Sequence, residues 1–347
     1  MDASPLLPLH QAAHARLQQA LPHAVLTYGD VPAEYRAAKT GAVLFDDTDR
    51  TRLRIAGPDA ESFLHRILSS HVKSLTPGRG QRALLLSAKG KVLFDFELYR
   101  TEAGYTLSIP AGRAAALAAA LDMYLFSEKL TLTQASADYA PLILTGPRTD
   151  EILELAFHIT PPAELYAHVQ FDDTILARTL HAGQPAVRIV AAPERVPELW
   201  RHLRDLGAQP AGLIVRDILR VEHLAPLFGV DIDDSIYPQE ARLEDAFSLD
   251  KGCYIGQEVV AKIDTYGGLN KRICALRLDN DDPVPPGTRL YRLDEGEWRD
   301  LGVITTWAYS FEYDTGAVLA YLKRRHQDIG TVFRVGDGPG TATVTRS

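Results

Sequence analysis

The sequence predicts an α+β protein whose C-terminal part is an antiparallel β-barrel. Up to about residue 270, hairpin-like strand patterns alternate with amphipathic helices. Beyond it, short strand patterns recur at even spacing, and glycine and proline separate them. We therefore expect an α+β region at 1–269, with two linked subdomains that divide near residue 145, and a β-barrel domain at 270–347.

The first part of the chain shows helix and strand patterns in turn. The spacing of leucine and alanine predicts a helix over 8–22, and polar–apolar alternation predicts a strand over 51–55. Asp59 follows a Gly-Pro turn, where it is placed to cap a helix. The other expected elements are a strand pair, a strand, a helix, a strand and a helix, in this order: 84–86 with 92–99, 105–109, 114–125, 140–144 and 150–156.

The second part continues with a strand over 187–190 and helices over 196–206 and 214–222. Tyr266-Gly267-Gly268 predicts a hinge, since two adjacent glycines interrupt regular structure. Five short strands are expected after it: 273–278, 289–292, 302–306, 318–322 and 331–335. Their spacing is typical of a small antiparallel barrel.

Length and charge limit the classes of function. The chain has 347 residues, which suggests two or three domains, and a net charge of -8. The acidic balance argues against a dedicated duplex-DNA binder, so we expect no DNA partner. Residues 36–100 carry twelve Lys or Arg against seven Asp or Glu. That stretch is either a solvated face or a surface that attracts an anionic ligand.

Cys253 and Cys274 form neither a CxxC motif nor a Cys/His cluster, so we expect no metal site and a reducing compartment. No uncharged apolar run approaches the length of a membrane span, and no signal-peptide pattern opens the chain. We expect a monomeric, cytoplasmic protein without a membrane partner.

The most informative run covers residues 250–262. Gly252 and Gly256 permit a tight backbone path around Cys253. Lys251 lies beside the cysteine, and a nearby cation favours the thiolate. Glu258 is placed to accept hydrogen bonds or to cap a helix. The alternative interpretation is a glycine-punctuated loop around an inert cysteine.

Residues 251–258 resemble the signature Lys-Gly-Cys-Tyr-x-Gly-Gln-Glu of the YgfZ-type folate-binding proteins. These proteins belong to the same superfamily as the aminomethyltransferase of glycine cleavage. Further segments resemble the family in the same order along the chain: 41–46, 144–147, 217–222, 228–232 and 238–240.

The resemblance implies a ring of two α+β portions around a folate cavity, closed by the barrel. It implies tetrahydrofolate, or a one-carbon derivative of it, as the cofactor. The residues implied to be catalytic are Cys253 and Asp95. Those implied to bind folate are Asp95, Gln184, Arg220, Glu240, Lys251, Gly252, Tyr254, Gly256, Gln257 and Glu258.

Two positions depart from the aminomethyltransferase pattern. Residues 90–95 match its G-x-x-x-D-D strand, with Asp95 kept and Phe94 in place of the first aspartate. The alternative for Asp95 is a surface carboxylate at a strand edge. Gln184 replaces the pterin-binding glutamate, and a glutamine cannot act as a carboxylate. Four basic residues are expected to attract a folate polyglutamate tail: Arg79, Arg82, Lys89 and Lys91.

The cysteine signature favours a tetrahydrofolate-binding accessory protein for iron–sulfur cluster assembly or repair, with iron–sulfur enzymes as clients. One alternative is an aminomethyltransferase, in which a folate nitrogen attacks an aminomethyl carbon on a lipoyl carrier and Asp95 stabilises the charge. Another is a non-catalytic docking partner of a tRNA-modifying enzyme. Whether the chain is an enzyme stays open at this point.

Overall fold

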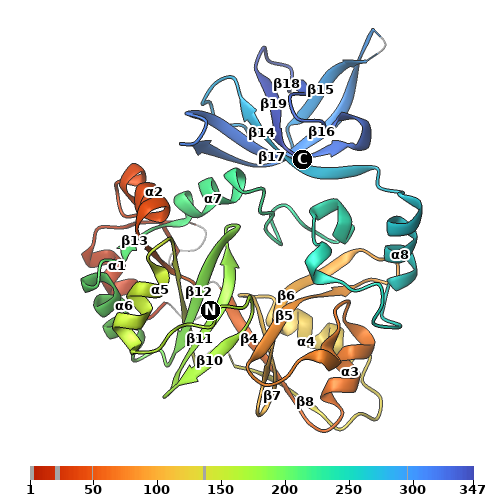
Figure 1. Ribbon diagram of the computed structural model, residues 1–347. Helices are drawn as coiled ribbons and strands as arrows, with labels where there is room; N and C mark the ends of the chain where they lie inside the picture. The colour runs from red at the N-terminus through yellow and green to blue at the C-terminus, as the bar shows by residue number, and fades with distance from the viewer. Residues whose placement is uncertain (1–3, 20–23, 49, 136–137, 295) are drawn as a thin grey trace. The chain divides into compact units, whose positions relative to one another are not determined.

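The computed structural model describes residues 4–19, 24–48, 50–135, 138–294 and 296–347 (Figure 1). The chain forms two compact units, one of residues 1–83 and 95–216 and the other of residues 84–94 and 217–347. This division does not fall at the boundaries predicted near residues 145 and 270, which stay a prediction. Within the described ranges, no helix is long and apolar enough to cross a membrane.

The N-terminal helix is shorter than predicted. Helix α1 spans Leu7–Ala12, and His14 then adopts a left-handed conformation with φ 53°. A left-handed residue cannot continue a right-handed helix, and strand β1 (Arg16–Leu17) follows, paired with β2 (Val25–Thr27). The helix expected over 8–22 was therefore wrong beyond Ala12, and its residues 20–22 lie outside the described residues.

A six-stranded sheet in the first unit has the order β10-β11-β12-β9-β3-β13, in which β13 pairs parallel to β3 and the other pairs are antiparallel. In that order the strands span His168–Phe171, Thr174–His181, Gln184–Ala191, Ala140–Thr145, Val43–Asp46 and Gln209–Pro210. Helices α5 (Thr149–Phe157) and α6 (Val196–Asp205) bury their apolar sides in one core with the sheet (Figure 1). Helix α2 (Val31–Thr40) begins at Asp30, whose side chain accepts a hydrogen bond from Ala33 N.

A five-stranded sheet has the order β5-β6-β7-β4-β8. Its strands span Arg79–Leu86, Val92–Thr101, Gly104–Pro110, Arg50–Ala56 and Thr131–Gln134, in that order. Its accompanying helices are α3 (Ala60–Ile67), η1 (Val72–Ser74) and α4 (Ala114–Asp122). Asp59 precedes α3 as predicted, but its carboxylate accepts the N–H of Lys129 (2.7 Å) and makes no cap bond to the helix.

The second unit contains a closed antiparallel barrel in the order β14-β17-β16-β15-β18-β19. In chain order, β14 to β19 span Lys271–Leu278, Arg289–Asp294, Glu297–Ser310, Thr315–Lys323, Val332–Val335 and Thr341–Arg346. The other helices are α7 (Leu213–Glu222), which crosses the boundary between the units, η2 (Pro238–Ala241), η3 (Glu244–Ala246), α8 (Gln257–Tyr266) and η4 (Arg324–His326).

The predicted fold class is confirmed: the chain is α+β, with a C-terminal antiparallel barrel. The barrel has one strand more than expected, because β19 follows the last predicted strand. Seven other strands were also missed: β1, β2, β3, β8, β10, β11 and β13.

A buried ionic network joins the two sheets of the first unit. Arg188 on β12 points away from the helices, and its Nε donates to Asp47 just after β3 (2.7 Å). Its Nη1 donates to Glu97 on β6 of the five-stranded sheet. Glu97 also accepts from the hydroxyls of Thr179 (2.7 Å) and Tyr99 (2.8 Å). Each charge is thus both paired and hydrogen-bonded, as burial requires.

The network controls the ionisation of Glu97. Burial alone would raise the pKa of this carboxyl, but Arg188, Arg50 and the two hydroxyls outweigh it and lower the pKa to about 2. A depressed carboxyl pKa adds stability that is complete above the ordinary value near 4.5 and is lost as the pH falls toward 2. The shift corresponds to roughly 3 kcal/mol.

We expect Glu97→Gln to lower the free energy of unfolding by about 3–5 kcal/mol at neutral pH, because it leaves Arg188 short of a buried counter-charge. Between about pH 4.5 and pH 2 the wild type should lose more stability than this variant, since only the wild type must protonate the carboxylate. Urea unfolding across that pH range measures both effects. Glu102→Gln, at an exposed position in the turn between β6 and β7, is the control. Parallel pH profiles for wild type and Glu97→Gln would contradict the assignment.

Candidate functional site

Asp95 lies on β6 with only 8% of its surface exposed. Its two carboxylate oxygens accept from Nε (2.9 Å) and Nη2 (2.5 Å) of Arg82 on the neighbouring strand β5. Such a two-pronged pair fixes the orientation of the carboxylate. Asp95 is therefore a buried, oriented acid and not the surface carboxylate that the sequence left as an alternative.

The surroundings of Asp95 on β6 are polar. Glu97 lies two residues along, so both side chains stand on the same face of the strand. Across the sheet, Glu97 is opposite Ser108 on β7, and Ser108 is opposite Arg52 on β4. Asp95 therefore shares its face with the network of Arg188 and with a group of arginines.

This group consists of Arg50, Arg52 and Arg188, which line one small cavity with Tyr139 and Ser108. The Arg52 guanidinium lies 4.8 Å from the centre of the Tyr139 ring, and burial lowers its pKa to about 10. The predicted basic stretch thus contributes Arg50 and Arg52 to this arginine cluster. Sequence reasoning missed it, although arginine at every second position of the strand at 50, 52 and 54 signals one cationic face.

Gln184, the proposed substitute for the pterin-binding glutamate, is the first residue of β12 and pairs with His181. Ala182 and Gly183 form the turn between them, with φ of 52° and 79°. The side chain is half-buried at this hairpin end. Its role in folate binding stays a prediction.

In the second unit, the signature run forms a loop that leads into α8. Gly256 precedes the helix with φ 79°, and a Cβ atom there would lie 2.6 Å from the carbonyl oxygen of Ser87. At Gly90, on the tip of the β5–β6 hairpin, a Cβ atom would lie 2.9 Å from the Cβ of Val259 in α8. The glycines therefore allow the backbone of the hairpin tip to lie close to the backbone of the loop before α8 (Figure 1).

Cys253 is exposed, whereas Lys251 and Tyr254 of the same loop are buried. Lys251 is 7% exposed, and its Nζ lies 5.1 Å from the centre of the Tyr254 ring. Tyr254 is equally buried, and burial raises its pKa to about 12. Its hydroxyl has no hydrogen-bond partner among the described residues, which leaves a buried polar atom to be satisfied.

Gln257 and Glu258 begin α8. Glu258 is exposed and accepts a hydrogen bond from Nζ of Lys262 (2.6 Å), one helical turn later. Gln257 is half-buried. Because solvent screens such an exposed pair, it contributes little to stability.

Glu240 and Lys91 meet around Tyr237. The Lys91 Nζ lies 3.1 Å from the centre of the Tyr237 ring, donates to Ser235 O (2.6 Å) and is 3.8 Å from Glu240. Burial lowers the pKa of Lys91, although Glu240 acts in the opposite direction. Glu240 itself is buried and accepts from Tyr237 N (2.9 Å), which completes a capping box on η2.

Arg220 is 3% exposed and lies at the centre of the second unit. It donates to Asp231 (2.7 Å), to Asp217 (3.1 Å) and to the hydroxyl of Thr306 on β16 (3.5 Å). These partners come from the helical segment and from the barrel. The structure thus gives Arg220 a role in holding the unit together, and its predicted place in a folate cavity stays a prediction.

No group of three or more His, Cys, Asp or Glu side chains suited to a metal occurs among the described residues. The site residues predicted from the sequence fall into two sets. Asp95 and Gln184 belong to the first unit, and the signature run, Arg220 and Glu240 belong to the second.

Comparison with known proteins identifies related chains. The family model described as "GCVT N-terminal domain" matches residues 10–251. A protein of Saccharopolyspora erythraea named aminomethyltransferase is 30% identical, over 98% of this chain and 94% of that protein. Another of the same name, from Symbiobacterium thermophilum, is 30% identical over 96% and 93%. The crystal structure of the glycine cleavage system aminomethyltransferase T from Bartonella henselae superposes with a TM-score of 0.88 at 24% identity, over 100% and 97% of the two chains, and thus shares the fold.

These findings correct the function expected from the cysteine signature. The preferred hypothesis, an accessory protein for iron–sulfur assembly with iron–sulfur enzymes as clients, was wrong. The relatives that cover nearly the whole chain carry the name aminomethyltransferase and favour that alternative. The eight-residue signature misled because it covers a short loop, whereas the similarity to these relatives extends from one end of the chain to the other.

We expect Gly256→Ala to destabilise the protein at least twice as much as Gly252→Ala. Both glycines have positive φ, which costs an alanine about 1–2 kcal/mol. Only at Gly256 would the new Cβ also press on backbone, whereas nothing lies within 4 Å of it at Gly252. Thermal unfolding of the two variants measures the difference, and equal losses would show that the close approach to Ser87 does not matter.

We also expect one thiol to react in the native protein. Cys253 is exposed, whereas Cys274 on β14 is buried, and burial raises its pKa to about 11. A thiol reagent at neutral pH should therefore modify one cysteine, and Cys253→Ala should abolish the reaction until the protein is unfolded. Two reactive thiols in the folded wild type would contradict the placement of Cys274.

Proposed function

This chain belongs to the GCVT family, and on that premise we propose that it is an aminomethyltransferase that acts on tetrahydrofolate. The observation that carries the proposal is its 30% identity to an aminomethyltransferase over 98% of the chain. The buried, oriented carboxylate of Asp95 supports the proposal from the side of the structure.

In the proposed reaction, a nitrogen of tetrahydrofolate attacks the methylene carbon of an aminomethyl group carried on the sulfur of a lipoyl arm. The carbon loses its bonds to sulfur and to the amino nitrogen, and it gains bonds to two folate nitrogens. The two protons that leave these nitrogens pass to the thiol and to ammonia. The products are methylenetetrahydrofolate, the free thiol and ammonia, and no electrons are exchanged with another reactant.

We assign Asp95 to the reacting nitrogen. Positive charge develops on that nitrogen during the attack, and a carboxylate held in place beforehand stabilises it without reorganisation. Arg82 holds the carboxylate through two hydrogen bonds, which fixes its orientation. We further assign the arginines Arg50 and Arg52 to attraction of the anionic glutamate portion of the folate.

The residues present fit a pterin ligand in part. Gln184 can donate to and accept from a pterin ring but cannot form the charged pair of a glutamate. We therefore propose weaker folate binding than a glutamate at this position would give.

Of the YgfZ-type signature, only Cys253 is given a separate interpretation. We propose that this exposed cysteine marks a branch of the family and that it is dispensable for one-carbon transfer. The expectations of a monomeric, cytoplasmic chain without a DNA partner stay predictions.

We expect the purified protein to form methylenetetrahydrofolate from tetrahydrofolate and an aminomethyl-loaded lipoyl carrier protein. Asp95→Asn should lower kcat/KM by about 10²-fold or more, since the variant loses the stabilising charge. Asp122→Asn, the same change at an exposed residue of the same unit, is the control and should keep full activity. A folded wild-type protein that binds tetrahydrofolate but forms no product would refute the proposal, and an unaffected Asp95→Asn would refute the role of Asp95.

A further inference from the structure

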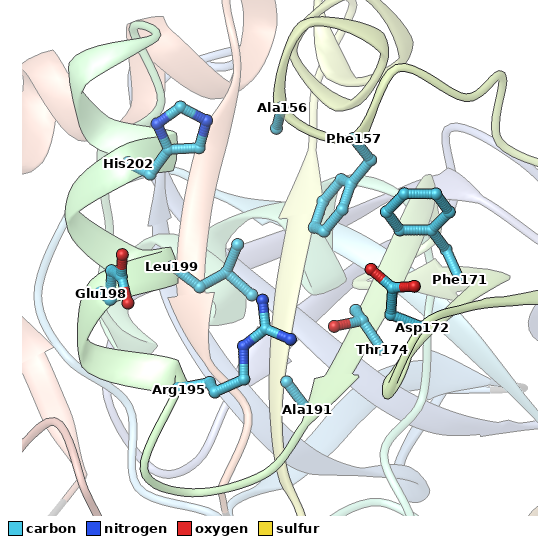
Figure 2. Close-up of a pocket in the computed structure, with 10 residues that line it drawn as sticks. All are labelled: Ala156, Phe157, Phe171, Asp172, Thr174, Ala191, Arg195, Glu198, Leu199 and His202. Atoms are coloured by element: carbon cyan, nitrogen blue, oxygen red, sulfur yellow. The ribbon is translucent and has the colours of Figure 1, made fainter.

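A second cavity lies in the first unit, away from the residues discussed so far. It has a volume of about 170 Å³ and is bounded by α5, by the β10–β11 turn, by β12 and by α6 (Figure 2). Sites for drug-sized ligands occupy roughly 300–1,000 Å³. This cavity therefore suits a much smaller ligand than folate, with space for about six water volumes at roughly 30 Å³ each.

The inner wall of the cavity is apolar. Phe157 at the end of α5 and Leu199 of α6 form it, with Ala191 of β12 behind them. Phe171, the last residue of β10, stands beside Phe157 in Figure 2 and is 39% exposed. Contact with an apolar group would remove the exposed aromatic ring from water, which is favourable. The wall therefore favours a ligand with an aromatic or branched apolar side chain.

One buried polar group points into this wall. Thr174 is 3% exposed, and Figure 2 shows its hydroxyl directed into the cavity. The hydroxyl thus lies where a molecule in the cavity can reach it. A buried hydroxyl normally has a partner, which in an open cavity is water or a ligand.

The mouth carries charges of both signs. Arg195, at the start of α6, lies over the cavity in Figure 2 and pairs with Asp173 of the β10–β11 turn. The carboxylate of Asp172 stands on the opposite side, between the two phenylalanine rings and Thr174. Glu198 of α6 also lines the cavity, and Asp173 is the partner of Arg195, so carboxylates outnumber Arg195 at the mouth. An ammonium group is therefore attracted, and a carboxylate on the same ligand is placed to meet Arg195.

We propose that this cavity binds a free α-amino acid with an apolar side chain. The side chain fills the wall formed by Phe157, Leu199 and Phe171. The carboxylate accepts hydrogen bonds from Arg195 and from the Thr174 hydroxyl, and the ammonium group pairs with Asp172. The cavity is thus an amino-acid site that is separate from the one-carbon chemistry proposed above and does not depend on it.

The test compares three probes that share a phenyl group and differ in charge: L-phenylalanine, 3-phenylpropionate and 2-phenylethylamine. Calorimetric titration of the full chain should show saturable binding of L-phenylalanine, with each singly charged probe at least about tenfold weaker, as expected for one lost charged hydrogen bond. No binding of L-phenylalanine would overturn the proposal. Equal or tighter binding of either singly charged probe would also overturn it, in favour of a site for apolar carboxylates or for apolar amines.

Three variants locate the site. Thr174→Val keeps the side-chain volume and removes the hydroxyl, while Arg195→Gln and Asp172→Asn each remove one charge at the exposed mouth. Each should weaken binding of L-phenylalanine about tenfold or more. Arg201→Gln, on the same helix but outside the cavity, is the matched control and should bind as the wild type does.

The two mouth variants keep the test decisive if Thr174→Val does not fold, because their side chains are exposed and their loss should leave the thermal midpoint unchanged. Wild-type affinity in both mouth variants would place any bound amino acid elsewhere and overturn the assignment. The transferase assay is a separate readout, so failure of either proposal is visible without the other.

Discussion

The buried pairs of Arg188 with Asp47 and Glu97 are the constraint on which the first unit depends. Removing a guanidinium and two carboxylates from water is costly unless each charge keeps its partner at hydrogen-bond distance. Because Asp47 follows a strand of one sheet and Glu97 lies in a strand of the other, the spacing of the two sheets is held to the length of these bonds. Asp95 is two residues from Glu97 on the same strand, so the network also determines where the proposed catalytic carboxylate stands.

Much of the architecture could be predicted because it depends on local periodicity. Alternating residues such as those of β4 and the closely spaced barrel strands carry their pattern in the sequence itself. The missed hairpin of β10 and β11 turns at Asp172, which adopts a φ of 51° where the usual turn signal is glycine or asparagine. Helix ends were harder to predict. At His14 the end depends on a left-handed backbone conformation, and at Asp59 the side chain bonds to Lys129, 70 residues away along the chain.

In the site, too, local features could be predicted and long-range contacts could not. Gly256 could be identified from sequence, since Gly252 and Gly256 in one short run indicate a tight backbone path. The burial of Arg188 could not, because its partners are 141 and 91 residues away along the chain. Arg220 stays a predicted ligand-binding residue, and its hydrogen bonds to Asp231 and to Thr306 of the barrel also give it a structural role. The sequence alone does not reveal this second role, because Thr306 is 86 residues away along the chain.

The hairpin tip Leu84–Phe94 belongs to the second unit, although β5 begins in the first unit and β6 ends there. No single cut of the chain therefore separates the units, and neither would be complete as a continuous fragment. During synthesis, the tip leaves the ribosome more than a hundred residues before Asp217, where the rest of its unit begins. At roughly 5–20 residues per second, its apolar residues such as Leu86 and Val92 wait on the order of ten seconds for their unit. The order of translation thus leaves this hairpin open to aggregation until the second unit is made.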